Sequence, residues 1–294
     1  MAGLGAGLRA CVPWWARIAG KLVLSRLPVP DRVWQRIGIF SPGTMLDPDY
    51  ALAVFERHFE AAGRPPPGFA FLELGPGDSL ASAVIGHAYG AARGWLVDSG
   101  AYASRDMAVY GKLIAKLRGM ETPVPLPDGF EATDVEGLLA RCNATFLEDG
   151  LASFKAVPDR ALDMVFSEAV LEHVPRDEFA AIVGEIHRVL KPGGIASHVV
   201  DYRDHLGGGL NNLRFSQSLW EAPWFARRSG FYTNRLRPSE MAKAFREAGF
   251  EVSVTVRARW PELPLRRAAL VLAFRGLGDG DLLTAETFVR LVKP

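Results

Sequence analysis

The pattern of apolar and polar residues divides the chain into a helical N-terminal part and a longer part in which strands and helices alternate. A proline and glycine cluster at 65–68 interrupts the helical pattern of residues 48–62. From Phe69 onward, short apolar runs alternate with helical stretches, which is typical of a largely parallel sheet covered by helices. The predicted strands lie near 69–74, 94–98, 143–147, 162–167, 194–200, 250–257 and 268–275.

One segment is longer than the ordinary connections of such a fold. Residues 202–236 are rich in glycine, asparagine, arginine and aromatic residues, and they lack an extended apolar run. Long insertions of this kind often serve function. We therefore predict a helical extension over residues 1–62 and a main domain over 63–294, with a substrate-binding or lid insertion at about 202–236.

Composition narrows the class of protein. Hydrophobic residues make up 49% and charged residues 23% of the 294 positions, as in globular proteins. The 34 basic and 33 acidic residues nearly cancel, so we predict no nucleic-acid partner. Cys11 and Cys142 are far apart and show no disulfide or zinc spacing, and no stretch is long and uncharged enough to span a bilayer. A cytoplasmic location is the default prediction.

The N-terminal segment differs from the rest in charge. Residues 1–40 hold six basic residues and one acid, and a helix is predicted to start near Pro13. On that helix, residues 14, 18 and 22 share one face, whereas Arg17, Lys21 and Ser25 share another. Two interpretations follow. The helix packs on the core or covers the ligand pocket, or residues 13–27 make peripheral contact with the inner membrane face.

The strongest chemical signal is the sequence FLELGPGDS at 71–79, in which an apolar strand runs into a tight glycine turn. A dinucleotide site would place a third glycine where this chain has Leu80. Glu73 and Asp78 flank the turn, and carboxylates there would repel a diphosphate but suit a ligand with an ammonium and a sulfonium group. These features favour S-adenosylmethionine and disfavour a nicotinamide oxidoreductase.

A second carboxylate supports the same ligand. Asp98 ends the next apolar run, 23 residues after Gly75, where a carboxylate can accept hydrogen bonds from both ribose hydroxyls. A capping or loop aspartate is the alternative.

Five motifs in order resemble the class I S-adenosylmethionine-dependent methyltransferases, and the pattern is methyltransferase type 11-like. They are ELGPG at 73–77, Asp98, DMVFS at 163–167, LEHV at 171–174 and RVLKPGG at 188–194. The similarity covers roughly residues 68–275, and the combination is far more specific than any single motif. LKPGG also has a structural interpretation, as a helix stop followed by a chain reversal.

The resemblance implies a doubly wound, Rossmann-like α/β sheet of seven strands, mostly parallel with an antiparallel last strand. It implies that Glu73, Gly75 and Gly77 line the methionine part of the cofactor and that Asp98 holds the ribose. Asp149 and Gly150 would approach the adenine, although EDGL at 148–151 permits more than one alignment. The candidate cofactor-binding residues are Glu73, Gly75, Pro76, Gly77, Asp78, Asp98, Ser99, Asp149, Gly150 and Ser167.

Candidate catalytic groups follow from the rule that ligands lie at the carboxyl ends of parallel strands. Glu168, Glu172 and His173 follow the fourth predicted strand, and the segment 201–205 follows the fifth. We predict Asp201, His205 and His173 as candidate catalytic residues. His198 could face either the pocket or the core. The candidate substrate-binding residues are Arg203, Tyr202, Trp224 and Arg235, and no metal site is predicted.

The sequence therefore predicts transfer of a methyl group from S-adenosyl-L-methionine to an oxygen or nitrogen of a small molecule or glycan, with S-adenosyl-L-homocysteine as product. Surface polysaccharides and specialised metabolites are the acceptor classes considered. The alternative is a non-catalytic protein that keeps the fold as a binding or membrane-docked scaffold. The sequence leaves the oligomeric state open.

Overall fold

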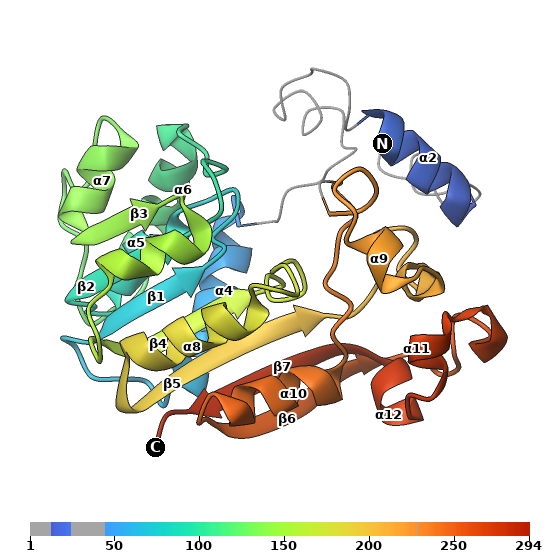
Figure 1. The fold of residues 1–294 in the computed structure, drawn as a ribbon. Coiled ribbons are helices and arrows are strands. Elements are labelled where there is room, and N and C mark those ends of the chain that lie inside the picture. Colours follow the sequence, from blue (N-terminus) through green and yellow to red (C-terminus); the bar gives the residue numbers. More distant parts are fainter. Residues whose placement is uncertain (1–12, 25–44, 228) are drawn as a thin grey trace.

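A seven-stranded sheet forms the centre of the computed structural model, which describes residues 13–24, 45–227 and 229–294 (Figure 1). The strand order is β3-β2-β1-β4-β5-β7-β6. The strands are β1 (Ala70–Leu74), β2 (Arg93–Val97), β3 (Ala144–Leu147), β4 (Leu162–Glu168), β5 (Leu190–Asp201), β6 (Glu251–Arg259) and β7 (Thr284–Val292). β1 to β5 pair in parallel, whereas β7 runs antiparallel to both β5 and β6.

Helices connect most of the strands. The α-helices are α2 (Trp14–Leu24), α4 (Pro48–Ala61), α5 (Ala81–Ala88), α6 (Met107–Arg118), α7 (Val135–Arg141), α8 (Phe179–Val189), α9 (Gln217–Trp220), α10 (Pro238–Glu247), α11 (Leu272–Arg275) and α12 (Asp279–Leu282). The 3-10 helices are η1 (Gly150–Ala156), η2 (Asn211–Arg214) and η3 (Arg267–Ala269).

Local sequence explains where several helices begin. The Asp47 carboxylate accepts a hydrogen bond from the backbone N–H of Asp49 at 2.8 Å, and Pro48 occupies the first turn of α4. Asp106 and Asp134 accept equivalent bonds at the starts of α6 and α7. α8 ends at Val189, immediately before LKPGG, so the predicted helix stop is confirmed.

The sheet has a hydrophobic core on each face. On one face, α4, α5, α6 and α7 pack against side chains such as Phe71 and Phe166. On the other, α8, α10 and η1 pack against Leu72 and Val165. Neighbouring residues of one strand thus point to opposite cores, as strand geometry requires.

The predicted fold class is confirmed, because the described sheet is seven-stranded, mostly parallel and antiparallel at the strand that comes last in the sequence. Six predicted strands match β1 to β6. The predicted strand at 268–275 is wrong, because these residues form η3 and α11 and pack in a separate small cluster with Leu210 and Leu282. A short apolar run does not distinguish a strand from a helix by its periodicity, whereas β7 alternates buried and half-buried positions.

α2 packs on the insertion, above α9 in Figure 1. Ile18 is 6% exposed in a cluster with Trp220 and Phe225, and the Trp14 ring meets Phe215 edge to face. This agrees with the packing interpretation of the predicted helix. Residues 1–12 and 25–44, which belong to the predicted extension, lie outside the described residues. Within the described part of the chain, no helix is both long and apolar enough to cross a membrane.

Candidate active site

The glycine turn lies at the carboxyl end of β1. Gly75 and Gly77 have φ values of +72° and +65°, in the region that favours glycine. A Cβ on Gly75 would lie 2.4 Å from a methyl carbon of Val170, so packing as well as conformation requires glycine there. A Cβ on Gly77 would meet no atom of the described chain within 4 Å. Gly75 therefore allows the turn to pack closely against Val170, and Gly77 leaves the other side of the turn free of atoms of the described chain.

The acids around this turn have unsatisfied oxygens. Glu73 Oε2 and both carboxylate oxygens of Asp78 are buried without a hydrogen-bond partner in the described part of the chain. Burial raises the pKa of Glu73 to about 8 and the pKa of Asp78 to about 6. Buried polar atoms without a partner are rare in folded proteins, so these oxygens fit a cationic, hydrogen-bond-donating ligand such as the methionine part of S-adenosylmethionine.

Asp98 follows β2 and is held by backbone groups. Its carboxylate accepts hydrogen bonds from the N–H groups of Gly77 at 3.0 Å and Ser99 at 2.7 Å. Burial raises the pKa of Asp98, although these two bonds favour its ionised form. The hydrogen bond from Gly77 holds the Asp98 carboxylate directly beside the glycine turn. A carboxylate that accepts hydrogen bonds from the ribose hydroxyls would have to lie there.

A cleft of about 670 Å³ opens over this edge of the sheet, a volume in the usual range for ligand sites. Seven of the ten predicted cofactor-binding residues line it together. They are Glu73, Gly75, Pro76, Gly77, Asp78, Asp98 and Ser99. Gly150 lies just behind, donating its N–H to the carbonyl of Asp98 at 2.8 Å. Neither Gly150 nor Asp149 lines the cleft in this conformation.

Two predicted catalytic residues, His173 and Asp201, also line the cleft. The Nδ1 of His173 lies 3.1 Å from the carbonyl oxygen of Tyr232, so Nδ1 holds the proton and Nε2 the lone pair. His173 is exposed to the cleft, but desolvation by the surrounding protein and then the charge of His205 lower its pKa to about 4, which keeps the ring neutral at pH 7. Burial raises the pKa of Asp201 despite its bonds to Arg203.

The third predicted catalytic residue, His205, stands behind His173. Their rings stack with centroids 4.8 Å apart, and His205 is not part of the cleft wall. Asp204 turns inward, where it accepts the N–H groups of Leu206 and Gly208 at 3.0 Å. The residues of the polar segment 201–205 therefore have different roles. Asp201 lines the cleft, whereas Asp204 stabilises the loop that follows β5.

Several predicted site residues do not line this cleft. Ser167 points to the opposite face of the sheet and bonds His198 Nδ1 at 2.8 Å, so His198 is a core histidine. The Tyr202 hydroxyl is buried against Thr287. Arg235 is buried and donates to the carbonyls of Asn212 and Phe215.

The two remaining substrate candidates are closer to solvent. Trp224 is exposed in the insertion and does not line the cleft. Arg203 lies beside the cleft, where its Nη1 pairs with Asp201 at 3.1 Å and Glu286 at 3.2 Å.

The sequence analysis missed a charged group opposite the glycine turn. Arg57 on α4, Arg257 on β6 and Glu286 on β7 line the cleft together with Glu168. Arg57 Nη1 reaches both oxygens of Glu168, at 2.9 and 3.0 Å. Glu286 was missed because β7 was placed too early. Arg257 lies in a correctly predicted strand, and neither its position nor the helical pattern around Arg57 gave a sign that the side chain faces a ligand.

His58 supports this group from inside the fold. The ring stacks between Phe166 and Phe288, and its Nδ1 and Nε2 contact Ser197 Oγ at 2.7 Å and Glu168 at 3.2 Å. Burial lowers the pKa of His58, so the ring is neutral. Burial alone would raise the pKa of Glu168, but its contacts with His58 and Arg57 outweigh this and hold it below the usual value.

The chain is similar to known methyltransferases. The sequence profile described as "Methyltransferase domain" matches residues 133–197. The "Ubiquinone biosynthesis O-methyltransferase" of Paramagnetospirillum magneticum is 27% identical over 232 residues, which cover 74% of this chain and 76% of that protein.

Solved structures similar to this chain include two methyltransferases. One is a phosphoethanolamine N-methyltransferase 2 of Haemonchus contortus in complex with S-adenosyl-L-methionine (16% identity, TM-score 0.47, 82% of this chain and 52% of that chain). The other is an O-methyltransferase family protein from Burkholderia thailandensis (14% identity, TM-score 0.46, 85% and 57%). This chain spans little more than half of each.

The strand order and the acidic glycine turn define a Rossmann-like methyltransferase. The match to a methyltransferase domain and the similarity to an O-methyltransferase support the class I S-adenosylmethionine-dependent methyltransferase family for this chain. The protein is an enzyme that uses S-adenosyl-L-methionine as methyl donor and forms S-adenosyl-L-homocysteine.

Proposed function

We propose that the enzyme methylates a hydroxyl group of a small molecule. The observation behind this proposal is that two proton acceptors, the Asp201 carboxylate and the Nε2 of neutral His173, line the same cleft as the glycine turn. A hydroxyl is a poor nucleophile until its proton is removed, whereas a neutral amine needs no such help. The similarity to a protein named an O-methyltransferase gives independent support.

The cofactor half of the cleft is assigned to the residues around the turn. Glu73 and Asp78 would hold the ammonium group, Asp98 the ribose, and Gly77 would allow close backbone approach. When bound, S-adenosylmethionine supplies a methyl group on a positively charged sulfur, open to in-line displacement. The main task of the protein is then to align the acceptor at short distance and to exclude water.

We assign Asp201 as the base and His173 as a hydrogen-bonding partner of the acceptor hydroxyl. Burial raises the pKa of Asp201 above its ordinary value, which makes its carboxylate a stronger base, whereas the pKa of His173 is lowered, which makes it a weaker one. His205 keeps the His173 ring in place by stacking and is a positioning residue.

The experiment begins with identifying the product. The purified enzyme is incubated with methyl-labelled S-adenosylmethionine and a fraction of small metabolites, and labelled products are analysed by tandem mass spectrometry. We expect O-methyl products. Because general-base catalysis contributes typically 10²- to 10⁴-fold, Asp201→Asn should lower kcat by about that factor and leave S-adenosylhomocysteine affinity within about twofold.

His198→Gln, a change at a histidine outside the cleft, is the control for general effects of substitution. Predominantly N-methylated products, or an Asp201→Asn enzyme with full activity on the identified acceptor, would refute the proposed chemistry.

Contact with a membrane surface is a second proposal, for residues 13–27. It is supported by the 61% exposure of Trp15 and by the excess of basic residues in the first 40 positions. Residues 25–27 lie outside the described part of the chain.

A further inference from the structure

The charges along the cleft are unevenly distributed. Around the glycine turn the ionisable side chains are acidic, namely Glu73, Asp78 and Asp98. Among the described residues, the positive side chains that line the cleft are Arg57 and Arg257. In the sheet order, Arg257 on β6 is separated from β1 by β4, β5 and β7. The cleft therefore has an acidic end for the cofactor, and the rest of its lining combines these two guanidinium groups with the carboxylates of Glu168, Asp201 and Glu286.

Arg57 retains donors after its contact with the protein. Its Nη1 pairs with both oxygens of Glu168, and His58 Nε2 contacts the same carboxylate. No hydrogen bond from Nε or Nη2 of Arg57 is found within the described residues. A guanidinium has five N–H donors in a planar fork that matches carboxylate and phosphate groups.

Among the described residues, Arg257 pairs with one oxygen of Glu286, whereas Arg57 contacts both oxygens of Glu168. Its Nη1 lies 3.2 Å from Glu286 Oε1 in an ion pair, and one third of its side chain is exposed. The other oxygen of Glu286 lies 3.2 Å from Arg203 Nη1, so two guanidinium groups share this carboxylate. The partners of Arg57 and Arg257 orient both groups, and they leave donor capacity on each.

The rest of the cleft lining is partly apolar and aromatic. Tyr50 and Tyr102 expose their rings, and Val170 and Val199 add aliphatic surface. Asp201 on β5 lies between β4 and β7 in the sheet order. An acceptor held by Arg57 and Arg257 would thus extend past Asp201 towards the glycine turn.

We propose that Arg57 and Arg257 form a subsite for an oxyanion, a carboxylate or phosphate group, of the methyl acceptor. This inference rests on the proposed function, because it assigns the acceptor half of the same cleft. It makes anionic small molecules the preferred acceptors and gives Arg57 and Arg257 the role of specificity-determining residues.

The test uses the full chain saturated with S-adenosylhomocysteine and three probes of similar size. Benzoate, phenyl phosphate and neutral benzyl alcohol are titrated by calorimetry or ligand-observed NMR at low salt. We expect at least one anion to bind about tenfold more tightly than benzyl alcohol, and the better anion identifies the group. Added salt should weaken anion binding, because the attraction is electrostatic.

Substitution tests the residues. Arg257→Gln, and separately Arg57→Gln, should lower the affinity for the anion to about that for benzyl alcohol. Arg259→Gln is the matched control, because Arg259 is exposed on the same strand and does not line the cleft. The Arg259→Gln variant should bind the anions with the wild-type affinity. All of the variants should bind S-adenosylhomocysteine with the wild-type affinity.

Equal affinity for the three probes, undetectable binding of both anions, or unchanged anion binding in the arginine variants overturns the inference. These outcomes are separate from the proposed function. If O-methyl products form while the probes bind equally, the inference alone fails. If the anions bind through the arginines while only N-methyl products form, the proposed function fails and the subsite stands.

Discussion

Glu73 is the residue whose protonation state should respond most to the cofactor. Its carboxyl is buried, one oxygen has no partner among the described residues, and its pKa of about 8 leaves it mostly protonated at pH 7. A cationic ligand favours the ionised form. Binding should therefore lower this pKa and release a proton wherever the free enzyme holds one, that is, below about pH 8.

We expect the affinity for S-adenosylmethionine to increase with pH between pH 6 and pH 7, by up to about tenfold per unit. In this range the α-amino group of the ligand, with an ordinary pKa of about 7.7–8.0, stays protonated and does not contribute. Calorimetry in buffers of different ionisation enthalpy measures the released proton. Glu73→Gln should bind more weakly and lose most of the pH dependence. A wild-type affinity that is constant over this range would contradict the assignment.

Individual residues also show how far the sequence located the cleft. Glu73, Asp78 and Asp98 line it and were predicted because charge and spacing around a glycine turn are local properties of the sequence. Ser167 does not line it, because membership of a motif does not specify the direction of a side chain. Phe166 and Glu168 face the α4 side of the sheet, so strand alternation places Ser167 on the other side, against His198.

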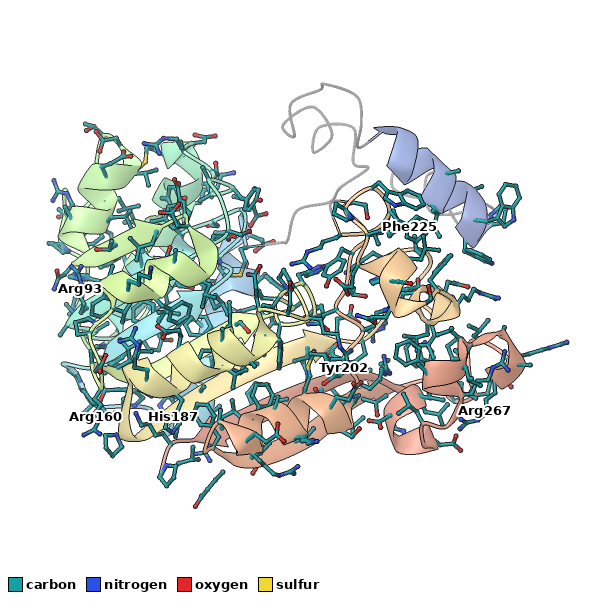
Figure 2. The ribbon with its side chains drawn as sticks, viewed as in Figure 1. Arg93, Arg160, His187, Tyr202, Phe225 and Arg267 are labelled. Atoms are coloured by element: carbon teal, nitrogen blue, oxygen red, sulfur yellow. The ribbon has the colours of Figure 1, made fainter. Side chains whose placement is uncertain are left out.

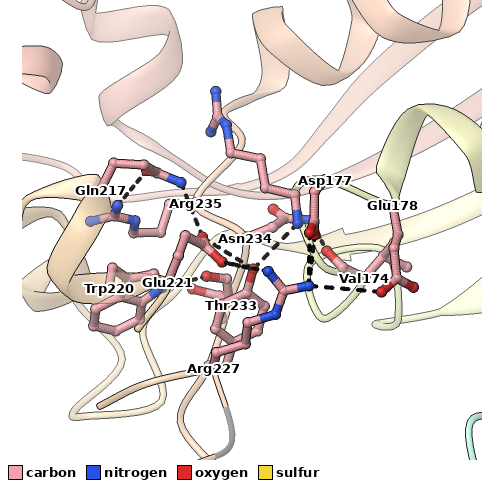
Figure 3. A network of polar contacts seen from close by, with 12 residues as sticks. Val174, Asp177, Glu178, Gln217, Trp220, Glu221, Arg227, Thr233, Asn234 and Arg235 are labelled. Atoms are coloured by element: carbon pink, nitrogen blue, oxygen red, sulfur yellow. Dashed lines mark hydrogen bonds and ion pairs between the residues drawn. The ribbon is translucent and has the colours of Figure 1, made fainter. Parts of the chain in front are cut away.

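At the scale of elements, the end of the insertion holds the turn that contains His173. Asn234 donates from Nδ2 to the carbonyls of Leu171 at 2.7 Å and Val174 at 2.9 Å. Its backbone N–H donates to the carbonyl of Glu172 at 2.7 Å. Figure 3 shows Asn234 beside Val174, with Arg227 bridging to Asp177 nearby. The insertion thus fixes the turn that contains His173.

Asn234→Ala should lower kcat at least tenfold while S-adenosylhomocysteine affinity stays within about twofold, because the glycine turn is untouched. Two buried carbonyls lose their partner, so unfolding should require about 1–3 kcal/mol less free energy. Steady-state kinetics and denaturant unfolding measure the two effects. Ser218→Ala, at an exposed position of the insertion, is the control. Equal losses of cofactor affinity and kcat would indicate general unfolding and would exclude a positioning role.

The sequence predicted the order of elements correctly up to the sixth strand, but it placed the seventh strand wrongly. Residues 268–275 are more continuously apolar than β7, yet they pack with Leu213 and Leu265 beside the sheet. β7 alternates polar and apolar residues because one of its faces meets α10 and the other contributes Glu286 to the cleft. The misplaced strand removed Glu286 from the predicted site. Such contacts depend on pairing between strands, which a single sequence does not reveal.

At the scale of the whole molecule, three segments far apart in the sequence surround the cleft. α4 supplies Arg57, the strand ends supply the acids, and the antiparallel pair β6–β7 supplies Arg257 and Glu286. Buried Arg237 connects the end of β5 with the start of β7 by donating to the carbonyls of Tyr202, Asp281 and Thr284. Figure 2 labels Tyr202 where β5 leads into the insertion. The site is therefore completed only when the C-terminal strands have paired.

α2 offers a test of how the N-terminal segment is used, because two of its neighbouring positions differ in environment. Ile18 is buried against the insertion, whereas Trp15 is 61% exposed. Ile18→Ala should weaken the packing of α2 and lower the free energy of unfolding by about 2 kcal/mol or more. Trp15→Ala should leave that stability unchanged and reduce co-sedimentation with vesicles that contain phosphatidylglycerol, since an interfacial tryptophan and basic residues act together there. Vesicles of phosphatidylcholine alone provide the comparison. If Trp15→Ala co-sediments as well as wild type, the exposed face of α2 is not a membrane contact, and the packing on the insertion is the role of this helix.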